Sequence, residues 1–200
     1  QPHAKFCASI SLSGDGNTMA VGAPGGGTRD EASDTESAVY IFTRNDDQWV
    51  EQATIKPGSY LTGDSFGFSV SLSADGNTLA VGSNSSTNNG AAYIFTRTDN
   101  IWKEQAYLKP SHQEPQNWYF PNVSLSGDGN TLAMGFPWEE AIYTSAQPPT
   151  PREITLQGMV SIFIYNDDGW TEQATLREKV VDTENRYYPS AGHYGWSLSL

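Results

Sequence analysis

A pattern of hydrophobic and polar positions recurs along this chain in units of four short apolar segments. In the clearest copy, apolar residues take every second position over 66–72 and form a nearly continuous run over 78–82. A third segment covers 92–97, and a fourth begins at Trp102. Short segments with period-two alternation are typical of β-strands, and no window shows the helical period of 3.6. The pattern predicts an all-β fold.

The four segments repeat about three and a quarter times. Self-similarity of this kind predicts stacked β units, and four antiparallel strands per unit are typical of a β-propeller blade. We expect a single partial β-propeller over 1–200, with blades at about 6–65, 66–118 and 119–193 and the start of a further blade at 194–200.

Turn residues separate the segments at fixed places. The first two strands of each unit are joined through Asp-Gly pairs at Asp15-Gly16, Asp75-Gly76 and Asp128-Gly129, which predict tight hairpins with positive φ. Polar turns at 45–48, 98–101 and 166–169 join the third and fourth strands and contain residues that tolerate left-handed backbone.

Length variation is confined to two connections in each unit. One joins the second and third strands, at 23–37, 83–90 and 136–158, and the other follows the fourth strand, at 57–65, 110–118 and 178–193. Strands of constant length with variable connections are expected of propeller blades, because the connections project from the packed sheets.

Two short signatures resemble a known repeat. Phe66-Gly67 ahead of the first strand and Gly22-Ala23-Pro24 after the second resemble the FG-GAP repeat, the blade of integrin-α-type propellers, in its bacterial-type short-hairpin form. The resemblance extends over nearly the whole chain and implies a cell-surface or extracellular propeller. Integrin-type blades hold Ca²⁺ through several aspartates between the first two strands, whereas each copy here has one Asp there, so no calcium site is carried over.

Composition limits the classes of partner. The 200 residues carry a net charge of −12 with only 11 Lys and Arg, which argues against a nucleic-acid-binding face. No apolar run is long enough for membrane insertion.

The single cysteine, Cys7, cannot form an internal disulfide. It occupies the position in the first unit that Gly67 occupies in the second, where a small residue is needed, and we therefore expect a packed thiol. Since propellers close with about four to eight blades, we expect further blades beyond Leu200 and before Gln1, or closure through another chain.

Candidate chemistry is sparse. His3, His112 and His193 lack metal-ligand spacing, and no nucleophile elbow or repeated acid–base pair is present. Acidic residues gather in the insertions, as in Glu139-Glu140, where solvated loop charge is the simpler interpretation and a glycosidase acid the alternative. The sequence predicts no catalytic residue, cofactor or metal and no enzyme.

Aromatic residues supply the candidate ligand contacts. Trp49, Trp102 and Trp170 recur at one position of the unit, which favours packing between strands or blades. The aromatic residues outside the repeat lie in or beside variable connections and are the ligand-binding candidates: Trp118, Tyr119, Trp138, Tyr143, Tyr187 and Tyr188. Two sequons make Asn84 and Asn122 candidates for glycosylation in a secretory route.

The function expected from this scaffold is a non-enzymatic extracellular or cell-surface module for adhesion or protein interaction through its variable loops. A glycan-binding propeller is the first alternative, and a protomer of an extracellular fibre or surface layer is the second. The expected partners are a protein or a glycan at the loop faces, together with further blades or copies of the chain. This functional expectation rests on analogy with the fold, since the residues themselves predict only the scaffold.

Overall fold

Three four-stranded antiparallel sheets make up the computed structural model, which describes residues 6–25, 37–58, 65–83, 90–111, 121–136, 142–143, 154–155, 159–177 and 199–200. Blade 1 contains β1 (Ser9–Leu12), β2 (Thr18–Ala23), β3 (Ala38–Asn45) and β4 (Gln48–Ile55). Blade 2 contains β5 (Ser69–Leu72), β6 (Thr78–Ser83), β7 (Ala91–Thr98) and β8 (Ile101–Leu108). Blade 3 contains β9 (Asn122–Leu125), β10 (Thr131–Phe136), β13 (Met159–Asn166) and β14 (Gly169–Arg177).

A short ladder pairs β11 (Ile142–Tyr143) with β12 (Ile154–Thr155) apart from the blades. The described residues contain no helix, so the predicted all-β fold is confirmed. No described segment is a helix of the length and hydrophobicity needed to cross a membrane.

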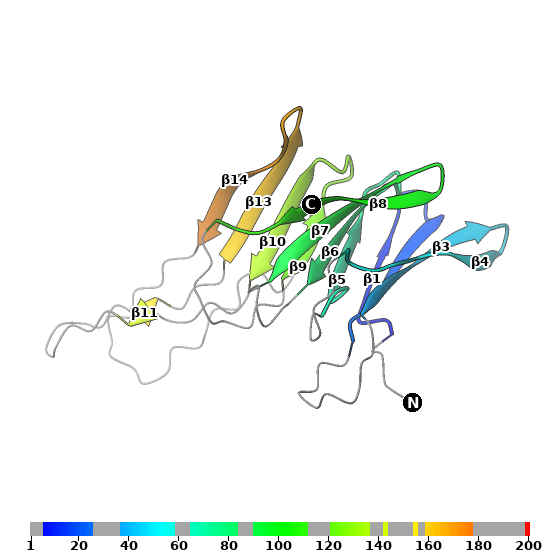
Figure 1. Ribbon diagram of the computed structural model, residues 1–200, viewed down its shortest axis with the longest axis horizontal. Coiled ribbons are helices and arrows are strands. Elements are labelled where there is room, and N and C mark those ends of the chain that lie inside the picture. Colours follow the sequence, from blue (N-terminus) through cyan, green and yellow to red (C-terminus); the bar gives the residue numbers. More distant parts are fainter. Residues whose placement is uncertain are drawn as a thin grey trace, which may run out of the picture.

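The blades stand side by side in chain order (Figure 1), with β1 against β5 and β5 against β9. Successive residues of a strand point to opposite faces, so β6 directs Leu79 and Val81 toward blade 1 and Ala80 toward blade 3. Each pair of adjacent blades encloses one hydrophobic core. The middle blade is therefore covered on both faces, which explains its continuous apolar run.

The first strand of blade 2 is shorter than predicted. It begins at Ser69 rather than Phe66, because Gly67 takes a φ of 85° and the Phe68 amide donates to the Ser65 carbonyl at 3.2 Å. This turn places Phe66, which is fully buried, edge-on to Tyr93 with ring centroids 5.4 Å apart. Phe66 therefore belongs to the core between blades 1 and 2 rather than to a strand.

The hairpin between the first two strands is wider than the two-residue turn that the Asp-Gly pairs predict. In blade 1 the Gly16 amide donates to the Ser13 carbonyl at 2.9 Å, and the described backbone has positive φ at Gly16 (70°) but not at Asp15. Asp15 instead acts through its carboxylate, as described below. The expected hairpin exists, but only its glycine supplies the left-handed backbone.

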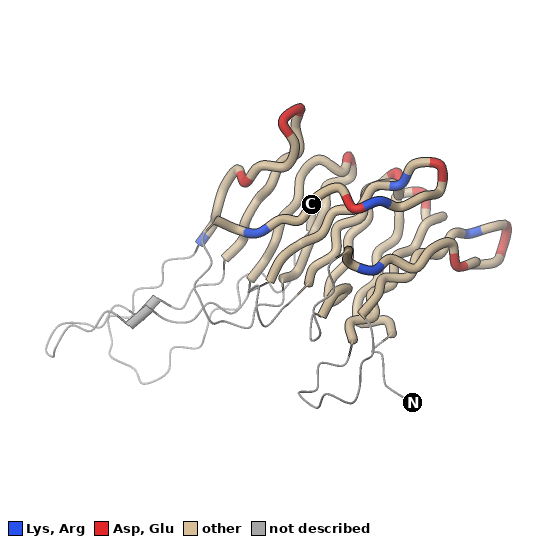
Figure 2. Tube along the Cα trace, in the orientation of Figure 1, with Lys and Arg blue, Asp and Glu red and all other residues tan. Residues whose placement is uncertain are grey.

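The turns between the third and fourth strands confirm their prediction. Asn45 pairs with Gln48, which leaves a two-residue turn in which Asp46 has a φ of 54°. Asp99 and Asn100 both take left-handed φ values, of 51° and 61°, in the corresponding turn of blade 2. Figure 2 shows acidic residues at the tips of such hairpins, and Asp46, Asp47 and Asp99 are exposed.

Cys7 is exposed, which corrects the expected packed thiol. Its φ of 73° matches the left-handed conformation of Gly67, so the two residues do occupy equivalent corners. The corner in blade 2 is buried because it packs against blade 1, where Gly67 accepts a hydrogen bond from Ser9 Oγ at 3.0 Å. No described residue covers blade 1 in the same way, and its corner therefore faces solvent.

Candidate functional site

The Asp-Gly hairpins place one carboxylate at the same end of each blade, and each carboxylate is held by its own turn. Ser13 Oγ donates to Asp15 Oδ1 at 2.6 Å, and the Asn17 amide donates to the same oxygen at 2.9 Å. The corresponding bonds recur around Asp75 and Asp128. The serine hydroxyl first, and then the Asn bonds, lower the pKa of all three aspartates.

These carboxylates do not fit the calcium site of integrin-type blades. That site needs several oxygens converging on one ion, whereas each Asp here is separately occupied by its serine and asparagine. The part of the chain that the structure describes contains no group of three or more His, Cys, Asp or Glu side chains able to hold a metal. The hairpins therefore serve as structural turns.

A row of serine contacts joins the first strands of successive units. The Leu72 amide donates to Ser11 Oγ at 2.9 Å, and the Leu125 amide donates to Ser71 Oγ at 2.9 Å. The Leu200 amide donates to Ser124 Oγ at 3.0 Å. Leu200 thus lies on blade 3 as Leu125 lies on blade 2, in the register expected for the first strand of a further unit.

A β-bulge recurs between the third and fourth strands of every blade. The register shifts after Ile41, Ile94 and Ile162, and in each case the partner strand has one unpaired glutamine: Gln52, Gln105 or Gln173. Bulges re-aim a side chain out of the regular alternation of the strand. Here the re-aimed side chain is an amide that can reach the neighbouring blade.

Gln52 binds three residues of blade 2. Its Oε1 accepts hydrogen bonds from Trp102 Nε1 at 3.3 Å and from Arg97 Nη1 at 3.2 Å, and its Nε2 donates to Asn100 Oδ1 at 3.1 Å. Blades 2 and 3 repeat the first of these contacts, since Trp170 Nε1 donates to Gln105 at 3.0 Å. We call the bulged glutamine and the tryptophan of the following blade a bulge latch.

Arg97 extends the latch between blades 1 and 2. Besides Gln52, its guanidinium donates to Asn77 Oδ1 at 3.0 Å and to Thr18 Oγ1 at 3.4 Å, and it lies 5.3 Å from the centroid of Trp102. Partial burial lowers the pKa of Arg97, while the charges of Asp75 and Asp15 act in the opposite direction. Arg97 remains a cation that joins the two blades.

A groove of about 440 Å³ lies between β4 and β8, beside the latch. Its lining includes Lys56, Trp102 and Glu104. Glu104 Oε2 accepts a hydrogen bond from the Gly58 amide at 3.3 Å, and Glu172 likewise accepts from Ser111 at 2.8 Å. Burial raises the pKa of Glu172, but hydrogen bonds from Ser111 and Thr175 lower it by more. The carboxylate of Glu104 in the groove thus accepts a hydrogen bond that joins blades 1 and 2.

Most of the predicted ligand-binding and glycosylation residues lie outside the described residues: Trp118, Tyr119, Trp138, Tyr187, Tyr188 and Asn84. Tyr143 lies in β11, and Asn122 begins β9, which pairs with β10 and contacts β5. The ligand-binding and glycosylation assignments remain predictions.

The latch residues were missed as functional positions although the sequence contains their signal. Trp-x-Glu-Gln-Ala occurs at 49–53, 102–106 and 170–174. Its tryptophan was predicted to pack between strands or blades, and the latches of Trp102 and Trp170 confirm this. The glutamine could have been identified too. A polar residue that occurs at the same strand position in all three units is expected to have the same kind of hydrogen-bond partner in each blade.

Comparison with solved structures finds a similarity to the periplasmic gluconolactonase of Pseudomonas aeruginosa, with 16% identity and a TM-score of 0.48. The match covers 90% of this chain but 59% of the other, so the chain spans less than two thirds of that protein. The expected non-enzymatic adhesion module, with its lectin and fibre alternatives, is contradicted by this match, because the similar protein is an enzyme by name. No curated protein matches the chain.

Residues 49–95 match the FG-GAP repeat family. The matched stretch runs from β4 of blade 1 into β7 of blade 2, so it contains the Phe66-Gly67 corner and the latch glutamine Gln52, while its partner Trp102 lies beyond the match. The resemblance expected from the sequence is thereby confirmed, and the chain carries an FG-GAP-type repeat over residues 49–95.

Proposed function

We propose that this chain is part of the scaffold of a β-propeller enzyme whose reacting groups lie at the end of the blades where the long connections leave. The observation that supports this proposal is the asymmetry of the sheets. In blade 1 the two tight turns follow β1 and β3, at one end, whereas β2 ends and β3 begins at the opposite end. Loops held on a rigid scaffold are where binding and catalytic residues concentrate.

The end of the blades that carries the tight turns is an unfavourable place for a general acid. Asp15, Asp75 and Asp128 each accept hydrogen bonds within their own turn, and these bonds lower the pKa of all three carboxyl groups, which favours their ionised forms. A general acid needs a raised pKa and a free oxygen that reaches the substrate. The opposite end is therefore the better place to seek catalysis.

The reaction class to be tested is hydrolysis of a small lactone, taken from the name of the similar Pseudomonas protein. The same name places that protein in the periplasm, and we propose that this chain also works outside the cytoplasm. A propeller with long connections at one end has room for a small-molecule site there.

A hydrolysis assay with a panel of sugar lactones tests the proposal. We expect turnover by the unmodified chain, loss of most of it in Glu139→Gln or Glu140→Gln, and full retention in Asp128→Asn, which removes a carboxylate at the turn end. Absence of turnover with every lactone, or equal loss in Asp128→Asn, would contradict the proposal.

A further inference from the structure

The chain contains four Asp-Gly pairs, and one of them has surroundings unlike those of the others. Three are the hairpin pairs that begin at Asp15, Asp75 and Asp128. The fourth, Asp168-Gly169, lies in the tight turn between β13 and β14 of blade 3. An aspartate before glycine can lose water to form a five-membered succinimide ring, because glycine has no side chain to hinder attack on the carboxyl carbon. The surroundings of each pair therefore decide how readily it reacts.

The three hairpin pairs are held at both reacting groups. The Asp75 carboxylate accepts hydrogen bonds from Ser73 Oγ at 2.6 Å and from the Asn77 amide at 3.0 Å. The Gly76 amide, which would attack the carboxyl carbon, donates to the Ser73 carbonyl at 3.0 Å. The first and third hairpins repeat these three bonds. Ring closure in a hairpin pair must break them first.

Asp168 has none of these bonds to its carboxylate. It is exposed, and among the described residues the structure gives its side chain no hydrogen bond and no ion pair. Its amide donates to Asn166 Oδ1 at 3.0 Å, and Gly169 takes a φ of 99°, as in hairpin loops that end with a left-handed glycine. A Cβ atom at Gly169 would meet nothing within 4 Å, so the turn is uncrowded.

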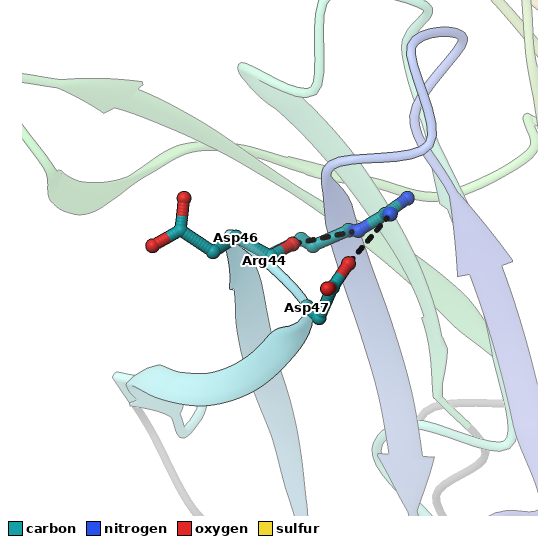
Figure 3. A network of polar contacts seen from close by, with 3 residues as sticks. All are labelled: Arg44, Asp46 and Asp47. Carbon is teal, nitrogen blue, oxygen red and sulfur yellow. Dashed lines mark hydrogen bonds and ion pairs between the residues drawn. The ribbon is translucent and has the colours of Figure 1, made fainter.

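The corresponding turn of blade 1 shows what blade 3 lacks. Asp47 has the position of Asp168, and its Oδ1 lies 3.8 Å from Arg44 Nη2 (Figure 3). Asp47 is followed by Gln48 rather than by glycine. In blade 3, Tyr165 takes the place of Arg44. Asp168 therefore has neither a cation beside it nor a bulky residue after it.

From these surroundings we propose that Asp168-Gly169 is a site of spontaneous isoaspartate formation, which the three hairpin pairs resist. The Gly169 nitrogen forms a bond to the carboxyl carbon of Asp168, and the hydrogen of this nitrogen leaves with the carboxyl hydroxyl group as one molecule of water. A water molecule then opens the succinimide. Cleavage at the side-chain carbonyl restores aspartate, whereas cleavage at the main-chain carbonyl gives isoaspartate, in which the backbone runs through the former side chain.

The modification lengthens the main chain by one carbon atom within the turn of blade 3. The added atom lies one residue before Trp170, whose Nε1 donates to Gln105 of blade 2 at 3.0 Å. It also displaces Gly169 from Asn166, its partner at the end of the ladder. We therefore expect isoaspartate formation to weaken the bulge latch between blades 2 and 3.

Incubation of the folded chain in warm, mildly acidic buffer, followed by peptide mapping, tests the proposal. Electron-transfer fragmentation distinguishes isoaspartate from aspartate at each position, and an isoaspartate-specific methyltransferase labels the modified carboxyl groups independently. We expect isoaspartate at Asp168 to accumulate at least about tenfold faster than at the hairpin aspartates, where charge-assisted hydrogen bonds must break first. In concentrated urea the four rates should converge, since the turns that protect three of the pairs are then lost.

Two variants separate the effect of the turn from that of the sequence. Asp168→Glu keeps the charge but would have to close a six-membered ring, so we expect no modification there. After the same incubation, its midpoint of thermal unfolding should stay unchanged, while that of the unmodified chain falls. Ser73→Ala removes a donor to Asp75 and is expected to raise the rate at Asp75 by about fivefold to tenfold.

Far-ultraviolet circular dichroism verifies that both variants fold. Absence of isoaspartate at Asp168 in the folded chain would overturn the proposal. Equal rates at the four pairs before unfolding would do the same, and so would a difference between them that persists in urea.

Discussion

Phe6 and Phe66 occupy equivalent positions in two blades, yet Phe6 is 58% exposed and Phe66 is fully buried. Phe66 lies on a face that the preceding blade covers, while Phe6 lies on the open face of blade 1. The same contrast separates Cys7 from Gly67. At the scale of the residue, burial is therefore set by the neighbouring blade as well as by the local sequence.

Glycine in the second strand is required by the approach of the next blade. A Cβ atom at Gly82 would lie 2.5 Å from the Pro121 carbonyl oxygen, so Gly82→Ala forces the backbones of blades 2 and 3 apart. We expect a loss of about 2–3 kcal/mol in the free energy of unfolding, measured by urea denaturation.

Gly127→Ala is the control for Gly82→Ala. Its Cβ would lie 3.6 Å from that of Ala74, an ordinary contact, and we expect a change within about 0.5 kcal/mol. Equal effects of the two substitutions would show that the close approach of Pro121 to Gly82 is not a constraint.

The hairpin aspartates make stability sensitive to acid. Hydrogen bonds lower the pKa of Asp15, Asp75 and Asp128 from the usual 3.8, so folding favours their ionised forms. Their contribution is present above the unfolded pKa and is lost as pH falls through the lower, folded pKa. We expect the urea concentration at the midpoint of unfolding to decrease as the pH is lowered from about 5 to about 2.

Asp75→Asn isolates this effect. The variant loses the carboxylate that accepts from Ser73 and Asn77, and we expect a shallower loss of stability in acid than in the unmodified chain. Asp99→Asn removes a charge from the tip of the other hairpin as a control. An unchanged acid dependence in Asp75→Asn would count against the assigned role of this turn.

At the scale of the element, the bulge latch is the feature that most clearly couples two blades. Gln52→Ala removes hydrogen bonds to Trp102, Arg97 and Asn100 in one step. We expect a destabilisation of about 1–3 kcal/mol, because the partly buried guanidinium of Arg97 also loses one of its hydrogen-bond acceptors. Thermal unfolding measures the change.

Gln48→Ala is a matched control in the same strand, since Gln48 is exposed at the start of β4. We expect it to leave the unfolding temperature almost unchanged. If Gln52→Ala were equally neutral, the latch would contribute nothing to the coupling of the blades.

The strands themselves were largely predictable, and their ends less so. Alternation located β5 and the apolar run located β6, because burial on one face or both determines those patterns. Phe66 was assigned to the strand because it continues the alternation, whereas the positive φ of Gly67 turns the chain there. The bulges were not predictable from periodicity, since an extra residue in a strand leaves the apolar pattern on either side unchanged.

At the scale of the whole molecule, repetition made the blade architecture predictable from sequence. The function was not predictable in the same way: adhesion was inferred from the scaffold, and one scaffold supports many activities. The predicted aromatic site, including Trp138 and Tyr143, was chosen for lying outside the repeat. Residues of this kind have no internal copies to compare, so their placement cannot be inferred from the repeat.

Successive blades are joined along their first strands, and amide hydrogen exchange tests this connection most directly. The Leu72 and Leu125 amides should exchange slowly, because Ser11 and Ser71 accept from them. The corresponding Leu12 amide has no such acceptor among the described residues and should exchange fast. Equal, fast exchange at all three leucines would contradict the stacking of the blades.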